Sequence, residues 1–127
     1  MPSFSDGIVV EIIDKWSAGF RRLDAEAIAS LYSDSVFFFG SKARLYRGRD
    51  GVAAYFNSLP RWSAPTVRFD VVTAQVSPDA INVAGTASFV VDNGAEPLSV
   101  KITWVIVRDD RDWKIVSHHV SSQIPLL

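Results

Sequence analysis

Apolar residues near the start of the chain recur with helical spacing. Between residues 8 and 22 they fall four positions apart, at Ile8, Ile12, Trp16 and Phe20. Residues three or four apart share one face of a helix, so these side chains should point the same way. The pattern predicts an amphipathic helix with one wide buried face.

A second, shorter helix is predicted directly after the first. Asp24 is suited to cap it, because a carboxylate accepts hydrogen bonds from the free N–H groups of a first turn. The inner face of this helix would be formed by Ala27, Ile28, Leu31 and Tyr32. The polar sequence at residues 33–35 is expected to end it.

A short aromatic strand and a third helix follow. Residues 36–39 are rich in β-prone side chains, and residues 44–46 are a candidate partner strand across a turn. The sequence Gly48-Arg49-Asp50 would then open a third helix with Asp50 as its N-cap. Pro60 would stop this helix.

Beyond Pro65 the period of the pattern changes to two. Four runs alternate between apolar and polar residues: Thr66–Val76, Ala80–Asp92, Leu98–Arg108 and Trp113–Gln123. The turns between them fall at residues 77–79, at Asp92-Asn93-Gly94 with a loop to Pro97, and at residues 109–112. Short turns between such runs predict an antiparallel meander. Helices followed by strands indicate an α+β fold, and we expect one domain over residues 1–127.

The alternation assigns each predicted strand an inner and an outer face. The more apolar sets should meet the helices; they are Ile81, Val83, Gly85, Ala87, Phe89 and Val91, then Ile102, Trp104 and Ile106, then Val116, His118 and Val120. The residues between them, such as Thr86, Ser88 and His119, should lie on the outer face of the sheet.

Composition removes several classes of function. The chain has 127 residues, a net charge of −1 and no cysteine, so a disulfide or a cysteine metal site is impossible. Charges of both signs are interspersed, so we expect no nucleic-acid partner, and no window approaches the ~20 apolar residues of a membrane span. The first seven residues do not resemble a signal peptide. We expect a cytoplasmic protein without a cofactor.

The order of the predicted elements resembles the NTF2-like superfamily. Residues 20–39 are similar to the helix pair of SnoaL-like proteins, and residues 46–51 followed by Tyr55-Phe56 are similar to their third-helix entry. Residues 103–125 resemble the last hairpin of the calcium/calmodulin-dependent protein kinase association domain and its bacterial relatives. The resemblance implies three N-terminal helices packed on a curved mixed, mainly antiparallel sheet that surrounds a pocket. It also implies a homodimer that pairs through the outer sheet face.

The chain departs from the functional patterns of these relatives. Ketosteroid isomerases of the superfamily carry an Asp base and a Tyr donor, and these positions match Phe39 and Trp16 here. A phenyl ring accepts no proton, so isomerase chemistry of that design is not expected. The basic pocket residues of the kinase association domain match Val52, Ala87, Trp104 and Val120. Both departures turn a polar pocket into an apolar one.

The two histidines of the chain are adjacent, at His118 and His119. Neighbouring residues of a regular strand face opposite sides, and no nearby carboxylate completes a ligand set, so we expect no metal site. His118 is either a core-edge histidine with a satisfied hydrogen bond or an acid/base or ligand anchor in the pocket, since its pKa lies near neutrality. His119 is expected at the dimer interface.

Aromatic and apolar residues make up the candidate ligand pocket. They are Trp16, Phe20, Tyr32, Phe37, Phe39, Val52, Tyr55, Phe56, Trp62, Ala87, Phe89, Trp104, His118 and Val120. An apolar lining with a few polar groups, here Tyr32, Tyr55 and His118, is typical of small-molecule sites. The alternative is that the aromatic residues simply form the core.

Three functions therefore stay open. The first is a small-molecule pocket protein of unassigned activity that binds a small hydrophobic ligand as a homodimer; the high aromatic content without a matching carboxylate favours it. The second is a lyase or isomerase with His118 as acid/base and Tyr55 or Trp16 as donor. The third is a non-catalytic assembly domain. Whether the chain is an enzyme is left open at this point.

Overall fold

The computed structural model describes residues 4–91 and 96–127, so the predicted turn at Asp92-Asn93-Gly94 lies outside the described residues. Three helices are present in this part of the chain: α1 (Phe4–Arg21), α2 (Ala25–Ala29) and α3 (Gly48–Asn57). The strands are β1 (Tyr32–Phe39), β2 (Tyr46–Arg47), β3 (Thr66–Val76), β4 (Ala80–Val90), β5 (Leu98–Asp109) and β6 (Asp112–Ser122). The predicted order of elements is confirmed.

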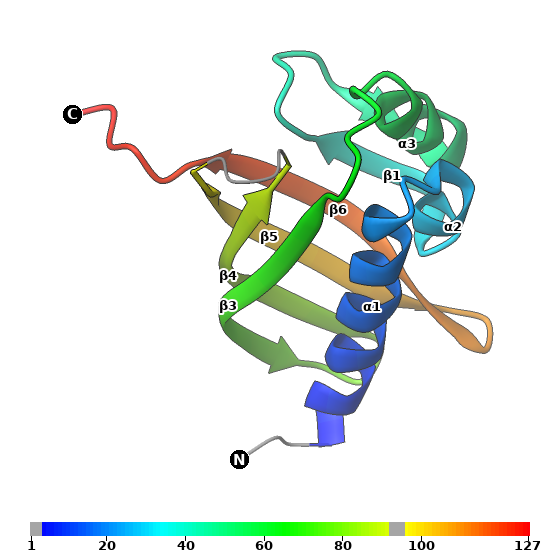
Figure 1. Cartoon of the computed structure of the whole chain (residues 1–127). Helices are drawn as coiled ribbons and strands as arrows, with labels where there is room; N and C mark the ends of the chain where they lie inside the picture. Colours follow the sequence, from blue (N-terminus) through cyan, green and yellow to red (C-terminus); the bar gives the residue numbers. More distant parts are fainter. Residues whose placement is uncertain (1–3, 92–95) are drawn as a thin grey trace.

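One curved, open sheet carries all six strands in the order β2-β1-β6-β5-β4-β3. The strands β3 to β6 form the predicted antiparallel meander, and among the described strands only the β1–β6 pair is parallel. Figure 1 shows the sheet bending around α1, with α2 and α3 together at one end beside β1. The predicted α+β architecture, three helices on a curved mixed sheet, is confirmed.

The core lies between the helices and the inner face of the sheet. Strand alternation is as predicted in β4 and β5, where Ile81, Val83, Ala87, Ile102, Trp104 and Ile106 are buried. In β6 the prediction is partly wrong: Ile115 is fully buried and Val116 is only half-buried. A β-bulge causes this, because Val105 pairs with Ser117 while the next residue of β5 pairs with Ile115.

The second helix is shorter than predicted. Asp24 caps it as expected, since its Oδ1 accepts a hydrogen bond from the Ala27 N–H at 3.0 Å. The helix ends at Ala29, and the Leu31 carbonyl accepts from the Ile115 N–H at 3.0 Å. That bond draws the chain into the sheet, so Tyr32 begins β1 instead of ending α2.

The third helix begins earlier than predicted. It starts at Gly48, and its N-cap is Arg47, which makes no capping bond through its side chain. Gly48 has a φ of +69°, a conformation that lets the chain turn directly from β2 into the helix and that disfavours other residues. Asp50 is therefore not the cap but lies in the first turn, where the helix dipole favours an anion.

Candidate functional site

A cavity of about 130 Å³ lies between the helices and the inner face of the sheet. Eight of the residues predicted for the pocket line it: Trp16, Phe20, Tyr55, Phe56, Trp62, Phe89, His118 and Val120. The rest of the wall was not predicted and comes from Phe38, Gly40, Ser41, Leu59, Val91, Leu98, Val100 and Ile102. Most of these side chains are apolar, so the cavity is a hydrophobic one.

Two residues expected in the pocket point away from it. The side chains of Phe37 and Phe39 are 52% and 38% exposed on the outer face, whereas Phe38 is buried against the cavity. The reason is register: Phe38 pairs with the inward-facing His118, and its neighbours must then face outward. The inward position of this strand therefore still holds a phenyl ring and not a carboxylate.

Four other predicted residues lie behind the wall of this cavity. Tyr32, Val52, Ala87 and Trp104 are buried and do not line it. Val52 and Ala87 are fully covered core positions. Tyr32 and Trp104 instead contact His118 through hydrogen bonds, so they affect the cavity through that side chain.

Aromatic rings pack closely along the helical side of the cavity. The Trp16 ring stacks on Phe20 with centroids 5.6 Å apart and meets the Phe56 and Phe89 rings edge-on. Such stacked and edge-to-face pairs add to the stability gained from burial. They hold this wall in place, so the helical side of the cavity is bounded by packed side chains.

Four side chains, two in the cavity wall and two behind it, form a buried hydrogen-bond network. The Trp16 indole N–H donates to the Tyr32 hydroxyl at 2.9 Å, and that hydroxyl lies 2.8 Å from the Nδ1 atom of His118. The Trp104 indole N–H donates to the same Nδ1 at 2.9 Å. On its other side the imidazole stacks on Phe38 with centroids 4.0 Å apart. The His118 ring is therefore held from several directions.

Burial sets the protonation of this network. It lowers the pKa of His118 from 6.5 to about 3, and the neighbouring His119 adds a smaller lowering effect. Burial also raises the pKa of the Tyr32 hydroxyl well above its usual range, although the hydrogen bond from Trp16 acts in the opposite direction. At neutral pH the imidazole and the phenol are therefore both uncharged.

Tyr55, the second catalytic candidate, uses its hydroxyl for structure. The hydroxyl oxygen accepts a hydrogen bond from the Ser41 N–H at 2.9 Å and lies 2.7 Å from the Ser41 Oγ. The loop can come this close only because residue 40 is glycine, since a Cβ there would lie 2.6 Å from the Tyr55 hydroxyl oxygen. The Tyr55 ring lines the cavity while its hydroxyl ties the β1–β2 loop to α3.

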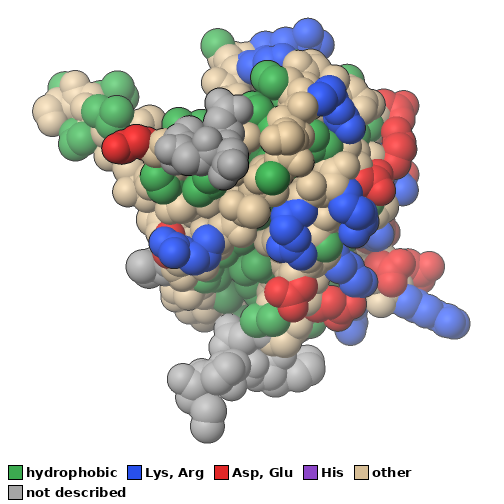
Figure 2. Space-filling model, viewed as in Figure 1, with side chains coloured by type: hydrophobic (Ala, Val, Ile, Leu, Met, Phe, Trp, Pro, Cys, Tyr) green, Lys and Arg blue, Asp and Glu red, His purple; other side chains and the backbone are tan. Residues whose placement is uncertain are grey.

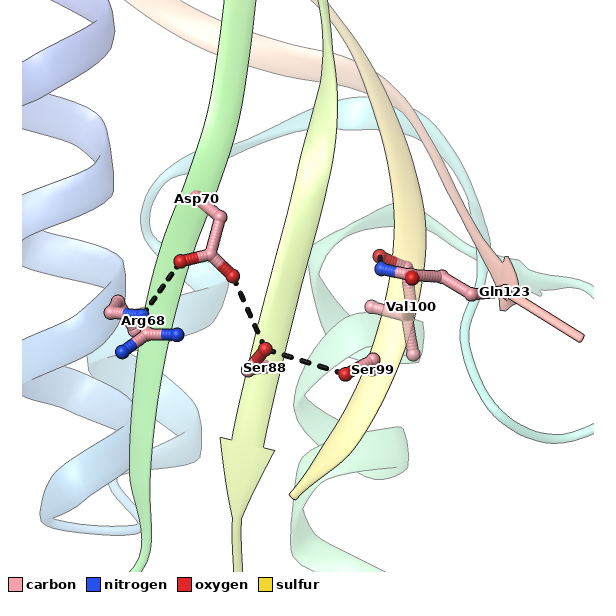
Figure 3. A network of polar contacts seen from close by, with 6 residues as sticks. All are labelled: Arg68, Asp70, Ser88, Ser99, Val100 and Gln123. Carbon is pink, nitrogen blue, oxygen red and sulfur yellow. Dashed lines mark hydrogen bonds and ion pairs between the residues drawn. The ribbon is translucent and has the colours of Figure 1, made fainter.

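The open side of the cavity meets a surface groove near the end of β6. Gly40, Ser41, Leu98, Val100 and Val120 line both. Figure 3 shows Gln123 beside Val100, and its side-chain N–H donates to the Val100 carbonyl at 3.2 Å. The segment after β6 is thus attached to the mouth of the cavity, while the chain end extends away from the sheet (Figure 1).

The outer face of the sheet has a polar and an apolar region. On β3 to β5, Asp70 accepts from Arg68 at 2.6 Å and from the Ser88 hydroxyl at 3.2 Å, as Figure 3 shows. On β1, Phe37 and Phe39 are exposed, with Phe39 against His119. The exposed aromatic region therefore lies at the β1–β6 side of this face.

Charged side chains of both signs lie on the face of the molecule seen in Figure 2. Figure 2 shows Lys and Arg side chains at separate places on the visible face, several of them beside acidic ones. Within residues 4–91 and 96–127 no cluster of His, Asp or Glu has the make-up of a metal site. None of the described helices combines the length and apolarity needed to cross a membrane.

Comparisons with known proteins define the class. Solved structures that match nearly the whole chain are named NTF2-like or described as having a cystatin-like fold. The sequence model of the SnoaL-like domain matches residues 9–125, and the chain belongs to that family. No curated protein matches the chain.

Three of the similar structures illustrate the range of the fold. An NTF2-like protein of unknown function from Pseudomonas putida is 14% identical, with a TM-score of 0.85, and the match covers 99% of this chain and 92% of that one. A protein named as a calcium/calmodulin dependent protein kinase II association domain, from Xanthomonas campestris, is 22% identical (TM-score 0.81; 94% and 87% covered). A hexachlorocyclohexane dehydrochlorinase from Novosphingobium barchaimii is 17% identical (TM-score 0.76; 94% and 87% covered). At these identities the likeness shows the fold alone.

Proposed function

We propose that this chain is a small-molecule pocket protein that binds a small hydrophobic ligand in the cavity between helices and sheet, as a homodimer. The observation that carries the proposal is the apolar cavity, whose wall combines packed aromatic rings with one neutral imidazole, that of His118. An apolar cavity with few polar groups is the usual form of a ligand site.

The size of the cavity limits the ligand. At about 130 Å³ it is smaller than the ~300–1,000 Å³ of most drug-sized sites. It is close to the ~150 Å³ of an engineered protein cavity that binds benzene. The part of the proposed ligand that enters the cavity is therefore a single ring or a group of similar bulk.

Filling the cavity should abolish binding. Val120→Phe adds a ring at the mouth of the cavity and is expected to weaken the binding of toluene at least tenfold, because the ring occupies the ligand's space. Val107→Phe makes the same change on a half-buried residue that does not line the cavity, and should leave the affinity near that of the parent. Titration followed by NMR measures both affinities. The proposal would be wrong if toluene does not bind the parent chain, or binds Val120→Phe equally well.

Native mass spectrometry of the freshly purified chain is the complementary experiment. An extra small mass that disappears on denaturation is expected, and its identity would name the natural ligand class. The same spectrum reports whether the chain is a dimer.

An elimination reaction is the strongest alternative, because one structural neighbour is named as a dehydrochlorinase. Removing hydrogen halide needs a base that takes a proton from carbon. The Nδ1 atom of His118 already lies within hydrogen-bond distance of the Trp104 N–H and the Tyr32 hydroxyl, and the inward position of β1 is Phe38. Within the described cavity wall no group is placed as a base, so binding is the better-supported function.

The outer face at β1 is the proposed dimer contact. Phe37 is 52% exposed there, and a second copy covering it would remove a large apolar surface from water. Phe37→Arg is expected to convert the dimer to a monomer, because a charge would be buried in the contact. Val10→Arg changes an equally exposed apolar residue on α1 and should leave the dimer intact. Light scattering after size exclusion measures both masses; a dimeric Phe37→Arg variant would place the contact elsewhere.

A further inference from the structure

The hydrogen bonds around His118 determine which ring nitrogen carries its proton. An indole N–H is only a donor, so the Nδ1 atom that faces the Trp104 N–H at 2.9 Å must be an acceptor. A proton on Nδ1 would point at the Trp104 hydrogen. The neutral imidazole therefore carries its proton on Nε2.

The Tyr32 hydroxyl supports the same assignment. Its oxygen accepts the Trp16 N–H at 2.9 Å, which leaves its own hydrogen free to be donated over 2.8 Å to the Nδ1 of His118. The Trp16 N–H therefore ends at the Tyr32 hydroxyl, while that hydroxyl and the Trp104 N–H both donate to the Nδ1 of His118. An imidazole that accepts at Nδ1 is a better donor at Nε2, because hydrogen bonds in a chain polarise one another.

The Nε2–H group is the free end of this network. Among the described residues every fully buried side-chain nitrogen and oxygen has a hydrogen-bond partner, and within this part of the chain the side-chain hydrogen bonds of His118 all involve Nδ1. Nε2 is therefore not fully covered, and His118 lines the cavity. Its Nε2–H is therefore available to a ligand in this hydrophobic cavity.

We propose that the Nε2–H of His118 holds the carbonyl oxygen of an uncharged, ring-sized ligand, and that Trp104 is a positioning residue that keeps His118 in this donor form. This rests on the proposed function, since it names the ligand class of the same cavity. A cationic or amine ligand does not fit, because Nε2–H cannot accept a hydrogen bond. A carboxylate does not fit either, because none of the described residues that line the cavity is a Lys or Arg that could offset its burial.

A pair of isosteric probes tests the ligand class. Cyclohexanone and methylenecyclohexane have the same shape and differ only in an oxygen that replaces a CH₂ group. Both should bind the parent chain. His118→Met keeps a side chain of similar bulk whose sulfur accepts weakly from Trp104 and Tyr32 but donates nothing. The variant should bind the ketone about tenfold more weakly and the hydrocarbon within about twofold of the parent.

The outcomes separate the two proposals. If neither probe binds the parent chain, the proposed function fails. If both bind and His118→Met weakens them equally or not at all, the pocket stands and the carbonyl inference is wrong.

Nitrogen NMR of the imidazole tests the inference without any change at His118. The spectrum of the parent chain should show Nδ1 without a proton and Nε2 with one, and cyclohexanone, but not methylenecyclohexane, should shift the Nε2–H signal. A proton on Nδ1 would overturn the inference. Trp104→Phe removes one donor to Nδ1 and should move the Nδ1 resonance, whereas Trp16→Phe leaves both donors in place and should move it less. Equal spectra for the parent and Trp104→Phe would rule out the positioning role.

Discussion

The free energy of unfolding is expected to fall steeply as the pH is lowered from about 6.5 toward 3. In the unfolded chain His118 takes up a proton near pH 6.5, whereas in the folded chain it does so only near pH 3. Between these values the unfolded state binds more protons, so acid favours unfolding. The stability contributed by the neutral buried imidazole is complete above pH 6.5 and is lost through this window.

The expected slope is large for a single side chain. One extra proton bound by the unfolded state lowers the free energy of unfolding by about 1.4 kcal/mol for each pH unit. The described contacts of the imidazole are with Tyr32, Phe38, Trp104 and the neighbouring His119, so no acidic group offsets the penalty for protonation there. A loss of several kcal/mol over the window is therefore expected.

Urea unfolding at a series of pH values between 7 and 4 measures how the free energy of unfolding depends on pH. At each pH this free energy is obtained by extrapolation to zero urea, with an m-value of roughly 1–3 kcal/mol per molar urea. His118→Met removes the titrating group and should flatten the profile relative to the parent. His119→Gln changes the exposed neighbour and should keep the steep profile. A parent profile no steeper than that of His118→Met would show that His118 is not held neutral in the folded chain.

Trp16→Ala is expected to destabilise the fold by about 3–5 kcal/mol. Trp16 is 2% exposed and packs its ring on Phe20 and edge-on against Phe56, Phe69 and Phe89. Truncation removes these contacts and the hydrogen bond to the Tyr32 hydroxyl together. Because Trp16 lines the cavity, the same change enlarges it, so any surviving folded protein should accept bulkier ligands.

Trp16→Phe separates the two contributions. It keeps a ring in the wall but removes the N–H donor, so a cost of about 1 kcal/mol is expected. Thermal or urea unfolding at pH 7 measures both variants. If Trp16→Phe costs as much as Trp16→Ala, the hydrogen bond and not ring packing holds α1 against the sheet.

Periodicity along the chain was enough to predict most of the architecture. The spacing of four residues in α1 and the alternation in β3 to β6 reflect burial of one face, which depends on local geometry that every helix or strand shares. The cap at Asp24 could be predicted for the same reason, because its carboxylate accepts a hydrogen bond from the backbone N–H of Ala27, only three residues away. The end of α2 was not predicted correctly, because a long-range hydrogen bond decides it: the Leu31 carbonyl accepts from the Ile115 N–H.

The phase of β1 could not be read from its own residues. Phe37, Phe38 and Phe39 are the same residue type, so no alternation of apolar and polar side chains shows which of them faces inward. Only the pairing of Phe38 with His118 and Tyr46 places its side chain on the inner face. The bulge in β6 is similar, because Ile115 and Val116 are both apolar and either could have faced the core. Val36, which is fully buried, shares the phase of Phe38, but nothing in the sequence marks it as an inward residue.

By itself the sequence determined the order of helices and strands and the antiparallel meander, because both follow from local spacing and side-chain type. The curvature of the sheet and the pocket were implied by the family resemblance, and the residue types at the matched positions made that pocket apolar. Only the tertiary structure decided that part of the aromatic content borders a cavity instead of filling it, since this depends on how rings from α1, α3 and the sheet pack together. It alone also brought Trp16, Tyr32, Trp104 and His118 into one network. Hydrogen bonds are directional, so residues far apart in the chain acquire a shared protonation state only once folding aligns their donors and acceptors.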